Sequence, residues 1–465
     1  MTESKIISDK NNLTTGKPLK KILLFTIPVF IGFIFQQFYS IVDAVIVDRT
    51  LGQTCFSAVG ITGSLSFLVL GFAQGITAGF SVVTSQYFGA KDNNQVRKSI
   101  ATSFILCIAV TVVLTVLSVI FTRQMLQALN TPEKYFEYSY SYISTIFYGI
   151  GASILYNMVA YILRSLGDSR TPLYFLIVAC VINIGLDFLF ILPFNMGIAG
   201  AGWATVLSQL LAGIACMIYM FIKYPFIRLK REDWKTSFSF CMKHMRLAVP
   251  MGFQFSTIAI GIMIQQSAIN SLGDDVVTAY TAASRIDQLA IQPICALGTT
   301  MATYCGQNYG AQQYERLRKG VRQSALLGLL ISVAATLIVS LLGKQMTYLF
   351  ISTATVRQTE LCQQYLRYQG AFYILLMAIY VYRNSLQGIN HSSITVVAGI
   401  LELTMRSVAA FVLVKILGFV GVCLSNPIAW LGSDMILLPA YAFAVKKFKK
   451  LESDRQSQNM TVKNN

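Results

Sequence analysis

Long runs of apolar residues, separated by short polar stretches, dominate the chain from its first third to its end. Clear examples cover 102–121, 173–193, 323–343, 396–417 and 428–445. An α-helix needs about 20 residues to cross the hydrocarbon core of a bilayer, and these runs have about that length. Transmembrane β-strands are shorter and alternate in polarity. The pattern therefore predicts an all-α protein that crosses a membrane many times.

Polar breaks between the runs divide the chain into twelve predicted helical segments. These are 22–48, 55–84, 99–121, 138–163, 172–193, 198–222, 247–270, 277–305, 321–343, 361–386, 393–416 and 419–445. The least distinct break is "LPFNMGIAG", where Pro193, Asn195 and Gly197 favour a short turn.

An internal repeat relates the two halves of the chain. The stretch "QYFGAKDNNQVRKS", which starts at Gln86, returns as "QNYGAQQYERLRKG", which starts at Gln307, 221 residues later. The same offset pairs Gly197 with Gly418. Six segments return the chain to its starting side, so the repeats run in the same direction, as in transporters built from parallel repeats. We expect two six-helix bundles related by a pseudo-two-fold axis along the membrane normal.

This repeat predicts the domain organisation. We expect an N-terminal tail at 1–21, an N-lobe at 22–222, a basic linker at 223–246, a C-lobe at 247–445 and a C-terminal tail at 446–465.

Basic residues are distributed unequally between the two sides of the membrane that this topology predicts. The side with both termini collects 28 lysines and arginines, against 7 on the other side. The positive-inside rule therefore places both termini in the cytoplasm. The same asymmetry accounts for most of the net charge of +17, so contact with anionic lipid headgroups explains it without any nucleic acid.

Composition narrows the function classes further. Hydrophobic residues make up 55% of the chain and charged residues only 12%, about half the charged fraction of a soluble protein. The nine cysteines are scattered singly, so they predict neither a metal site nor a disulfide framework. His244 and His391 are interpreted as ordinary residues of polar loops. No Walker-type phosphate-binding motif and no nucleophile–base pair is present, so we expect neither an ATP-driven pump nor an enzyme, and no cofactor beyond a coupling ion.

Several motifs, in a fixed order, resemble one transporter family. They are "IPVFIGFIFQQFYSIVDAVIVDRTLG", "GITAGFSVVTSQYFGAKD", "LRSLGDSRTP", "INIGLDFLFI", "GIAGAGWATVLSQ" and, in the second half, "GTTMATYCGQNYGA". Together they resemble the multidrug and toxic compound extrusion (MATE) transporters, and most of all their bacterial proton-coupled branch, which includes the DNA-damage-inducible F-like and staphylococcal-type exporters. The resemblance covers nearly the whole chain and implies export by alternating access, driven by inward flow of H⁺ or Na⁺.

The resemblance also implies a cation-coupling site in the N-lobe. The positions that match the family's site are Asp43, Asn183, Asp187 and Thr205, with Asn157 as a further asparagine from the fourth helix. Acids that some sodium-coupled members carry in their seventh and tenth helices are absent here, which argues against a C-lobe sodium site of that kind.

The residues themselves support this interpretation. Asn183 and Asp187 are four apart and therefore share one face of a helix, and Asp43 follows Pro28, which permits a bend in the first helix. Two carboxylates in a dry pocket cannot both stay ionised cheaply, so we expect at least one to hold a proton. A buried polar cluster that only fastens helices together, or a Na⁺ site built from the same oxygens, remains an alternative.

Other polar residues at intramembrane depth have less specific interpretations. Glu402 and Arg406 are four apart and are expected to form an ion pair, with structural and gating roles both open. For Asp287, near Arg285, and for Asp434, a packing role and a functional role are equally open. Amides and aromatic residues predict a substrate cleft between the lobes; they are Gln36, Gln37, Tyr39, Gln265, Gln266 and Asn270, beside Phe38.

The predicted function is a multi-pass antiporter of the cytoplasmic membrane, expected to be monomeric. It exports amphipathic, often cationic organic compounds in exchange for H⁺ or Na⁺, because buried acids and aromatic side chains suit lipophilic cations. Two alternatives remain: a flippase for lipid-linked oligosaccharides from the same superfamily, and a membrane receptor that transports nothing.

Overall fold

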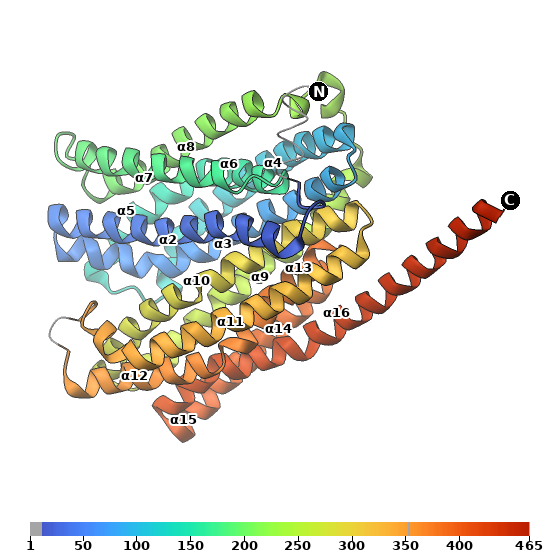
Figure 1. Ribbon diagram of the computed structural model, residues 1–465. Coiled ribbons are helices and arrows are strands. Elements are labelled where there is room, and N and C mark those ends of the chain that lie inside the picture. The colour runs from blue at the N-terminus through green and yellow to red at the C-terminus, as the bar shows by residue number, and fades with distance from the viewer. Residues whose placement is uncertain (1–11, 352–353, 465) are drawn as a thin grey trace. The chain divides into compact units, whose positions relative to one another are not determined.

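The computed structural model describes residues 12–351 and 354–464, and the regular structure of these residues is helical throughout (Figure 1). The first half comprises α2 (Pro18–Leu51), α3 (Gln53–Gly89), α4 (Asn93–Ala128), α5 (Glu133–Tyr148), α6 (Ile150–Ser165), α7 (Arg170–Ile191) and α8 (Gly197–Lys223). Two short 3₁₀ turns follow, η1 (Pro225–Ile227) and η2 (Arg231–Trp234).

The second half repeats this order. It comprises α9 (Phe238–Asn270), α10 (Asp274–Gly310), α11 (Tyr314–Thr347), α12 (Val356–Ala371), α13 (Tyr373–Gly388), α14 (Ser392–Val408), the π-helical turn η3 (Ala409–Leu413), α15 (Val414–Leu417) and α16 (Phe419–Asn464). Each of the twelve predicted segments coincides with one helix or one interrupted helix. The prediction of an all-α, polytopic membrane protein is confirmed.

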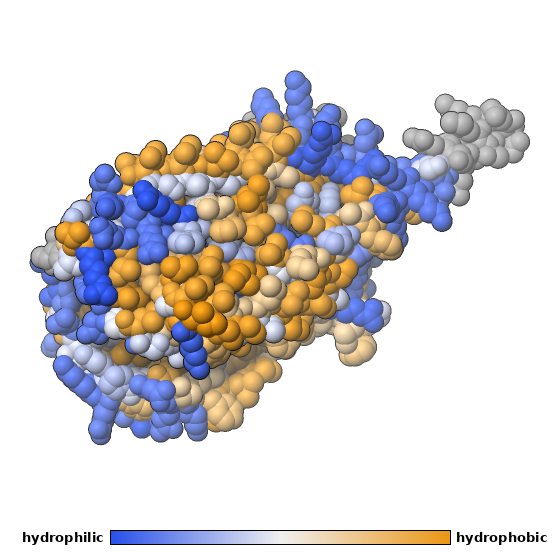
Figure 2. All heavy atoms as spheres, turned by 90° about the horizontal axis from the view of Figure 1, so that it is seen from below, coloured by the Kyte–Doolittle hydropathy of each residue, from blue (hydrophilic) through white to orange (hydrophobic). Residues whose placement is uncertain are grey.

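Helix length and composition agree with membrane spans. Within 12–351 and 354–464, nine helices are long and apolar enough to cross a bilayer, and the bent pair α5 and α6 makes a tenth. Large apolar side chains are exposed along α4 and α11, among them Ile108, Ile120, Leu330 and Leu341. On the face in Figure 2, hydrophobic side chains cover broad areas and hydrophilic side chains gather towards the ends of the helices. Such exposed apolar helix surface is what a lipid environment requires.

The fourth and tenth predicted segments are each interrupted once. The first of these breaks lies at Gly149, where the axes of α5 and α6 differ by 48°. A Cβ atom at this position would lie 2.0 Å from the side chain of Val206 on α8. Only glycine permits this close approach. The second break lies at Phe372, between α12 and α13.

The backbone confirms the internal repeat. Positive φ angles recur at positions 221 residues apart: Gly52 and Gly273 (82° and 97°), Lys91 and Gln312 (60° and 56°), and Gly197 and Gly418 (58° and 57°). Left-handed backbone is rare for residues other than glycine. Its return at Lys91 and Gln312 shows that both halves make the same turn after their second helix.

The compact units do not follow the predicted lobe boundaries. One unit contains Ile27–Ala259, and the other contains Leu13–Thr26 together with Ile260–Asn465. The predicted linker, 223–246, and the first part of α9 therefore belong to the first unit. The first turns of α2 belong to the second unit, where the Thr26 hydroxyl donates to Thr300 Oγ1 at 2.9 Å.

Close backbone contact explains why the start of α9 packs within the first unit. A Cβ atom at Gly79 of α3 would lie 2.3 Å from the Cα atom of Ala248, and one at Gly75 would lie 2.4 Å from the carbonyl oxygen of Met251. These two glycines let α3 and α9 touch through their backbones.

His244 lies in this same contact and was predicted wrongly as a loop residue. It is fully buried in α9. One ring nitrogen is 2.9 Å from the carbonyl oxygen of Phe240, and the other is 2.9 Å from Ser99 Oγ, which is itself 2.9 Å from Thr84 Oγ1. The histidine thus joins α9 to α3 and α4. His391, by contrast, does precede a helix, as the interpretation of a loop residue requires.

Candidate functional site

The first unit contains a buried acidic cluster, built from α2, α7 and α8. Asp43 lies in the second half of α2, beyond Pro28, and is 7% exposed. Its Oδ1 atom has no hydrogen-bond partner among the residues that the structure describes. A polar side chain in this state is costly, because it has lost water and gained no replacement.

Asn183 and Asp187 stand one turn apart on α7 and are 1% and 0% exposed. Most of α7 is apolar, yet Asn183 and Asp187 are among its few buried residues. Within the described part of the chain, the side-chain oxygen and nitrogen atoms of these two residues have no hydrogen-bond partner. Native proteins leave few such groups unpaired, so four unpaired polar atoms together indicate a site that receives a proton, an ion or another ligand.

The carboxyl groups of Asp43 and Asp187 are electrostatic neighbours, although no hydrogen bond of good geometry joins them across the described residues. The Thr205 hydroxyl, from α8, is also without a partner there. Asp43 and Asp187 are thus neighbours, Asn183 lies one helical turn from Asp187, and Thr205 is linked to Asp43 through Tyr39. Their part in ion coupling stays a prediction.

Tyr39, predicted as a residue of the substrate cleft, lies beside this acidic cluster. Its hydroxyl group is buried and lies near Asp43, Thr205 and Ser208, without a hydrogen bond of good geometry among the described residues. Tyr39 precedes Asp43 by one helical turn, so both side chains lie on the same face of α2. This spacing was a signal in the sequence that the prediction did not use.

Asn157 has a contact of its own on α6, where its amide nitrogen donates to the carbonyl oxygen of Ser153 at 2.9 Å. This bond stays within the helix and does not by itself bring Asn157 into the cluster. Metal binding by several acids has no support in the described residues, where no three His, Cys, Asp or Glu side chains gather.

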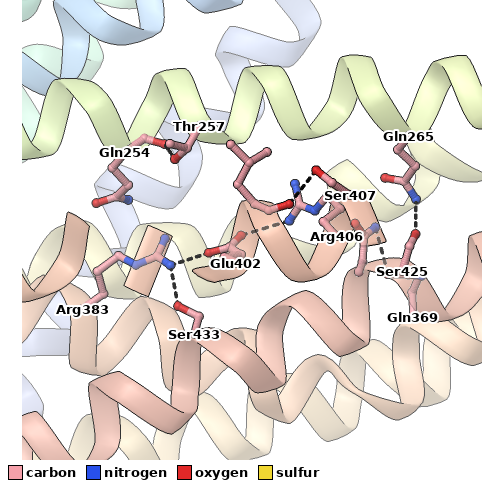
Figure 3. Close-up of polar contacts among 12 residues, drawn as sticks. Gln254, Thr257, Gln265, Gln369, Arg383, Glu402, Arg406, Ser407, Ser425 and Ser433 are labelled. Atoms are coloured by element: carbon pink, nitrogen blue, oxygen red, sulfur yellow. Dashed lines mark hydrogen bonds and ion pairs between the residues drawn. The ribbon is translucent and has the colours of Figure 1, made fainter. Parts of the chain in front are cut away.

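The remaining residues of the predicted cleft lie in different surroundings. In α2, Gln36 is exposed and Gln37 is half-buried. In α9, Gln266 donates to Asn270 at 2.9 Å, near the end of the helix. Gln265 is 2% exposed and donates to Ser425 Oγ on α16 at 3.0 Å (Figure 3). This hydrogen bond joins α9 to α16, and a role for Gln265 in the substrate cleft stays a prediction.

A second buried charged cluster lies in the second unit, around Glu402. The predicted ion pair with Arg406 is confirmed, at 2.9 Å between Nη2 and Oε1 (Figure 3). Arg383 of α13 forms a second ion pair, with the other carboxylate oxygen of Glu402, and donates to Ser433 Oγ of α16. Asp434 lies close enough to Arg383 and Glu402 to interact electrostatically, and is 3% exposed.

Arg383 is a buried cation that the sequence did not indicate, because it lies near the end of the tenth apolar segment. The structure places it inside α13, 4% exposed. Arg285, by contrast, has an exposed side chain. Asp287, two residues later, accepts a hydrogen bond from the Tyr373 hydroxyl at 2.6 Å, which gives it a packing role between α10 and α13.

Asp168 organises the turn between α6 and α7 in the motif "LRSLGDSRTP". One carboxylate oxygen accepts from the backbone nitrogens of Arg170 and Thr171, at 3.1 and 3.0 Å. The other accepts from the Thr171 hydroxyl (2.6 Å), Lys223 Nζ (2.8 Å) and the Tyr224 hydroxyl (2.8 Å). Burial alone would raise the pKa of Asp168, but the hydrogen bonds from Lys223 and Thr171 outweigh it and hold the pKa below its usual value.

Replacing Asp168 with Asn is expected to lower the free energy of unfolding by roughly 1–3 kcal/mol at pH 7, because hydrogen bonds to a charged acceptor are lost. Since the native pKa is lowered, the stability supplied by the ionised carboxylate is complete above the usual carboxyl pKa of about 4 and is lost as the pH falls through the native value. The difference between the wild-type protein and Asp168→Asn should therefore narrow in acid. Thermal unfolding in detergent from pH 7 to pH 3 measures this, and a difference independent of pH would contradict it.

Comparison with known proteins extends over most of the chain. The family model MatE matches residues 28–189 and 250–412. The probable multidrug resistance protein YpnP of Bacillus subtilis is 29% identical over 365 residues, which cover 78% of this chain and 80% of that protein. The multidrug export protein MepA of Staphylococcus saprophyticus is 19% identical over 339 residues, which cover 72% and 74%.

Solved structures show the same fold. An outward-facing multidrug resistance MATE family transporter of the MOP superfamily superposes with a TM-score of 0.86 at 23% identity, over 93% of this chain and 97% of that chain. A MOP superfamily transporter from Pyrococcus furiosus, described as having a binding pocket of reverse polarity, gives a TM-score of 0.87 at 22% identity, over 94% and 98%.

Proposed function

The chain belongs to the MatE family, a family of membrane transporters, and we propose that it exports amphipathic, often cationic organic compounds across the cytoplasmic membrane in exchange for protons. Its relatives include proteins named for multidrug resistance and multidrug export, which supports organic compounds as the substrate class. The excess of basic residues on one side supports an orientation with both termini in the cytoplasm.

The observation that carries the proposal is the juxtaposition of Asp43 and Asp187 in the first unit. Both are buried, both belong to helices long and apolar enough to span a membrane, and their carboxyl groups are electrostatic neighbours. An ionised carboxylate at this depth is costly, and two neighbouring ones also repel each other. The pair is therefore stable with at least one proton and becomes fully ionised only when water or a cation reaches it.

This arrangement suits an exchange of proton for substrate. A proton taken up from outside neutralises the pair, and its release to the cytoplasm restores the negative charge. An organic cation is attracted to the negative pair and loses that attraction when the proton returns. The two ligands then oppose each other through one site, which is the thermodynamic requirement for coupled antiport. Asn183 and Thr205 can donate to the ionised form and accept from the protonated form.

The second unit does not favour the alternative of a flippase for anionic lipid-linked oligosaccharides. Such a substrate requires an excess of positive charge in the transport path. The buried arginines Arg383 and Arg406 are both paired with Glu402, and Asp434 lies beside them. Two acidic side chains stand beside two basic ones, so the cluster has no excess of basic groups.

Ethidium transport into everted membrane vesicles, under an imposed ion gradient, tests the proposal. A vesicle interior more acidic than the medium should drive ethidium uptake into the vesicles, and collapse of the pH gradient should release it. A Na⁺ gradient of equal size at constant pH should have little effect. Ethidium movement that follows Na⁺ and ignores pH would reassign the coupling ion, whereas no movement under either gradient would overturn export of this substrate class.

A further inference from the structure

We propose that a groove between the start of α2 and the start of α11 binds the headgroup of an anionic, hydroxyl-bearing phospholipid such as phosphatidylglycerol. The groove lies within the second unit and has a volume of about 560 Å³. Its lining comes from both helices: Lys17, Pro18, Leu19, Lys20, Leu23, Leu24, Lys319 and Gln323. This inference concerns a lipid and does not depend on the transported substrate or on the coupling ion.

Charge makes the groove selective for an anion. Lys17, which directly precedes α2, Lys20 of α2 and Lys319 of α11 all have exposed side chains. Their three ammonium groups form no ion pair with any residue that the structure describes. Glu315, one turn before Lys319, is the nearest acidic residue along α11, and it too forms no ion pair with a described residue. A phosphate group between the helices would meet three positive charges, the arrangement found where basic pockets between transmembrane helices bind anionic headgroups.

Gln323 adds a preference for a hydrogen-bond donor, which an ionised phosphate does not supply. Its Oε1 atom is buried and has no hydrogen-bond partner among the described residues. An amide oxygen accepts hydrogen bonds and cannot bind a phosphate oxygen. The hydroxyl groups of a glycerol headgroup are donors, so they can satisfy Gln323 while the phosphate contacts the lysines.

The apolar part of the lining suits the upper part of the acyl chains. Leu19 and Leu24 are 37% and 49% exposed at the groove. Beyond it, α11 presents Leu326 and Leu330, which are 56% and 68% exposed. A lipid with its headgroup in the groove can therefore lay its chains along an apolar helix surface, which distinguishes it from a free phosphate ion.

Hydrogen bonds from α10 and α11 hold the start of α2 in place and so prepare the groove. The Arg316 guanidinium donates to the carbonyl oxygens of Leu13 (3.0 Å), Thr15 (2.9 Å) and Gly16. The backbone nitrogen of Leu13 donates to Gln307 Oε1 at 2.9 Å. Gly16 has a φ of +76°, and this turn leads directly into Lys17. Lys17 and Lys20 thus belong to the lining of the groove before any lipid binds.

Native mass spectrometry of the full-length protein, with added phosphatidylglycerol, phosphatidic acid or phosphatidylethanolamine, tests the proposal. The wild-type protein should bind phosphatidylglycerol in preference to the other two. A triple variant, Lys17→Gln with Lys20→Gln and Lys319→Gln, should bind it on the order of a hundredfold more weakly, since each basic residue near an anionic lipid contributes about fivefold. Gln323→Leu should lose about three- to tenfold for phosphatidylglycerol, the worth of one hydrogen bond, and nothing for phosphatidic acid.

A matched control removes the same charge elsewhere. Lys446→Gln with Lys447→Gln and Lys449→Gln alters exposed lysines of α16 that do not line the groove, and it should bind phosphatidylglycerol as the wild type does. An equal loss in both triple variants would show a general charge effect and overturn the proposal. Displacement of the lipid by inorganic phosphate at the same concentration, or equal binding of phosphatidylethanolamine, would overturn it as well.

Discussion

Replacing Asp187 with Asn is expected to abolish efflux driven by a pH gradient while leaving the protein folded. Asparagine has nearly the same shape and can occupy the buried position, but it cannot release and rebind a proton. Coupling between two ligands is typically worth 5- to 150-fold in affinity, so substrate accumulation should fall by about that factor. Ethidium uptake into everted vesicles measures the loss, and ethidium binding to purified protein shows whether the binding site survives.

Asp43→Asn should have an effect of similar size, and the double variant should be no worse than either single one. Groups that act as a unit are strongly non-additive, because the first substitution already removes the function. Asp48→Asn is the matched control, since Asp48 lies on the same helix with an exposed side chain, and it should transport normally. Undiminished gradient-driven efflux in both buried variants would remove this pair from the mechanism.

The order of helices could be predicted from the sequence because a bilayer sets the length of each apolar run. The breaks within the fourth and tenth segments could not. Gly149 is required because Val206, 57 residues later, packs against it; no property of the sequence around Gly149 reveals that contact. The packing of α9 against α3 could not be predicted for the same reason, since the glycines of α3 that admit the start of α9 show their use only in contact.

The candidate site was predictable to the extent that charge at membrane depth is costly and therefore conspicuous. Asp187 stood out on this ground, whereas Asp43 was implied by the resemblance to the MATE family. Tyr39 did not stand out, because a tyrosine in a transmembrane helix can face lipid, substrate or a polar cluster with equal ease. Arg383 lies five residues from the end of its helix, where basic residues usually reach the lipid headgroups. Only its contact with Glu402, on the next helix, shows that it is buried.

Arg383→Met is expected to lower the free energy of unfolding by about 3–5 kcal/mol, the usual cost of removing one partner from a buried ion pair. The four charges Arg383, Glu402, Arg406 and Asp434 sum to zero, so the variant leaves one uncompensated negative charge among them. Glu402→Gln should have a similar cost for the opposite reason, because it leaves one uncompensated positive charge. Thermal unfolding of the wild-type protein and the two variants, purified in detergent, measures these differences.

The double variant, Arg383→Met with Glu402→Gln, restores neutrality, since Arg406 and Asp434 then balance each other. Its cost should be smaller than the sum of the single costs by about 0.5–3 kcal/mol, the range for residues that interact directly. Arg357→Met, an exposed arginine of α12, should change stability by no more than about 0.5 kcal/mol. Simple additivity in the double variant would mean that each side chain acts through its own packing. A double variant that costs less than the two single variants together would instead show that charge balance stabilises this region of the second unit. A proton or ion that upset this balance would then affect α13, α14 and α16 together.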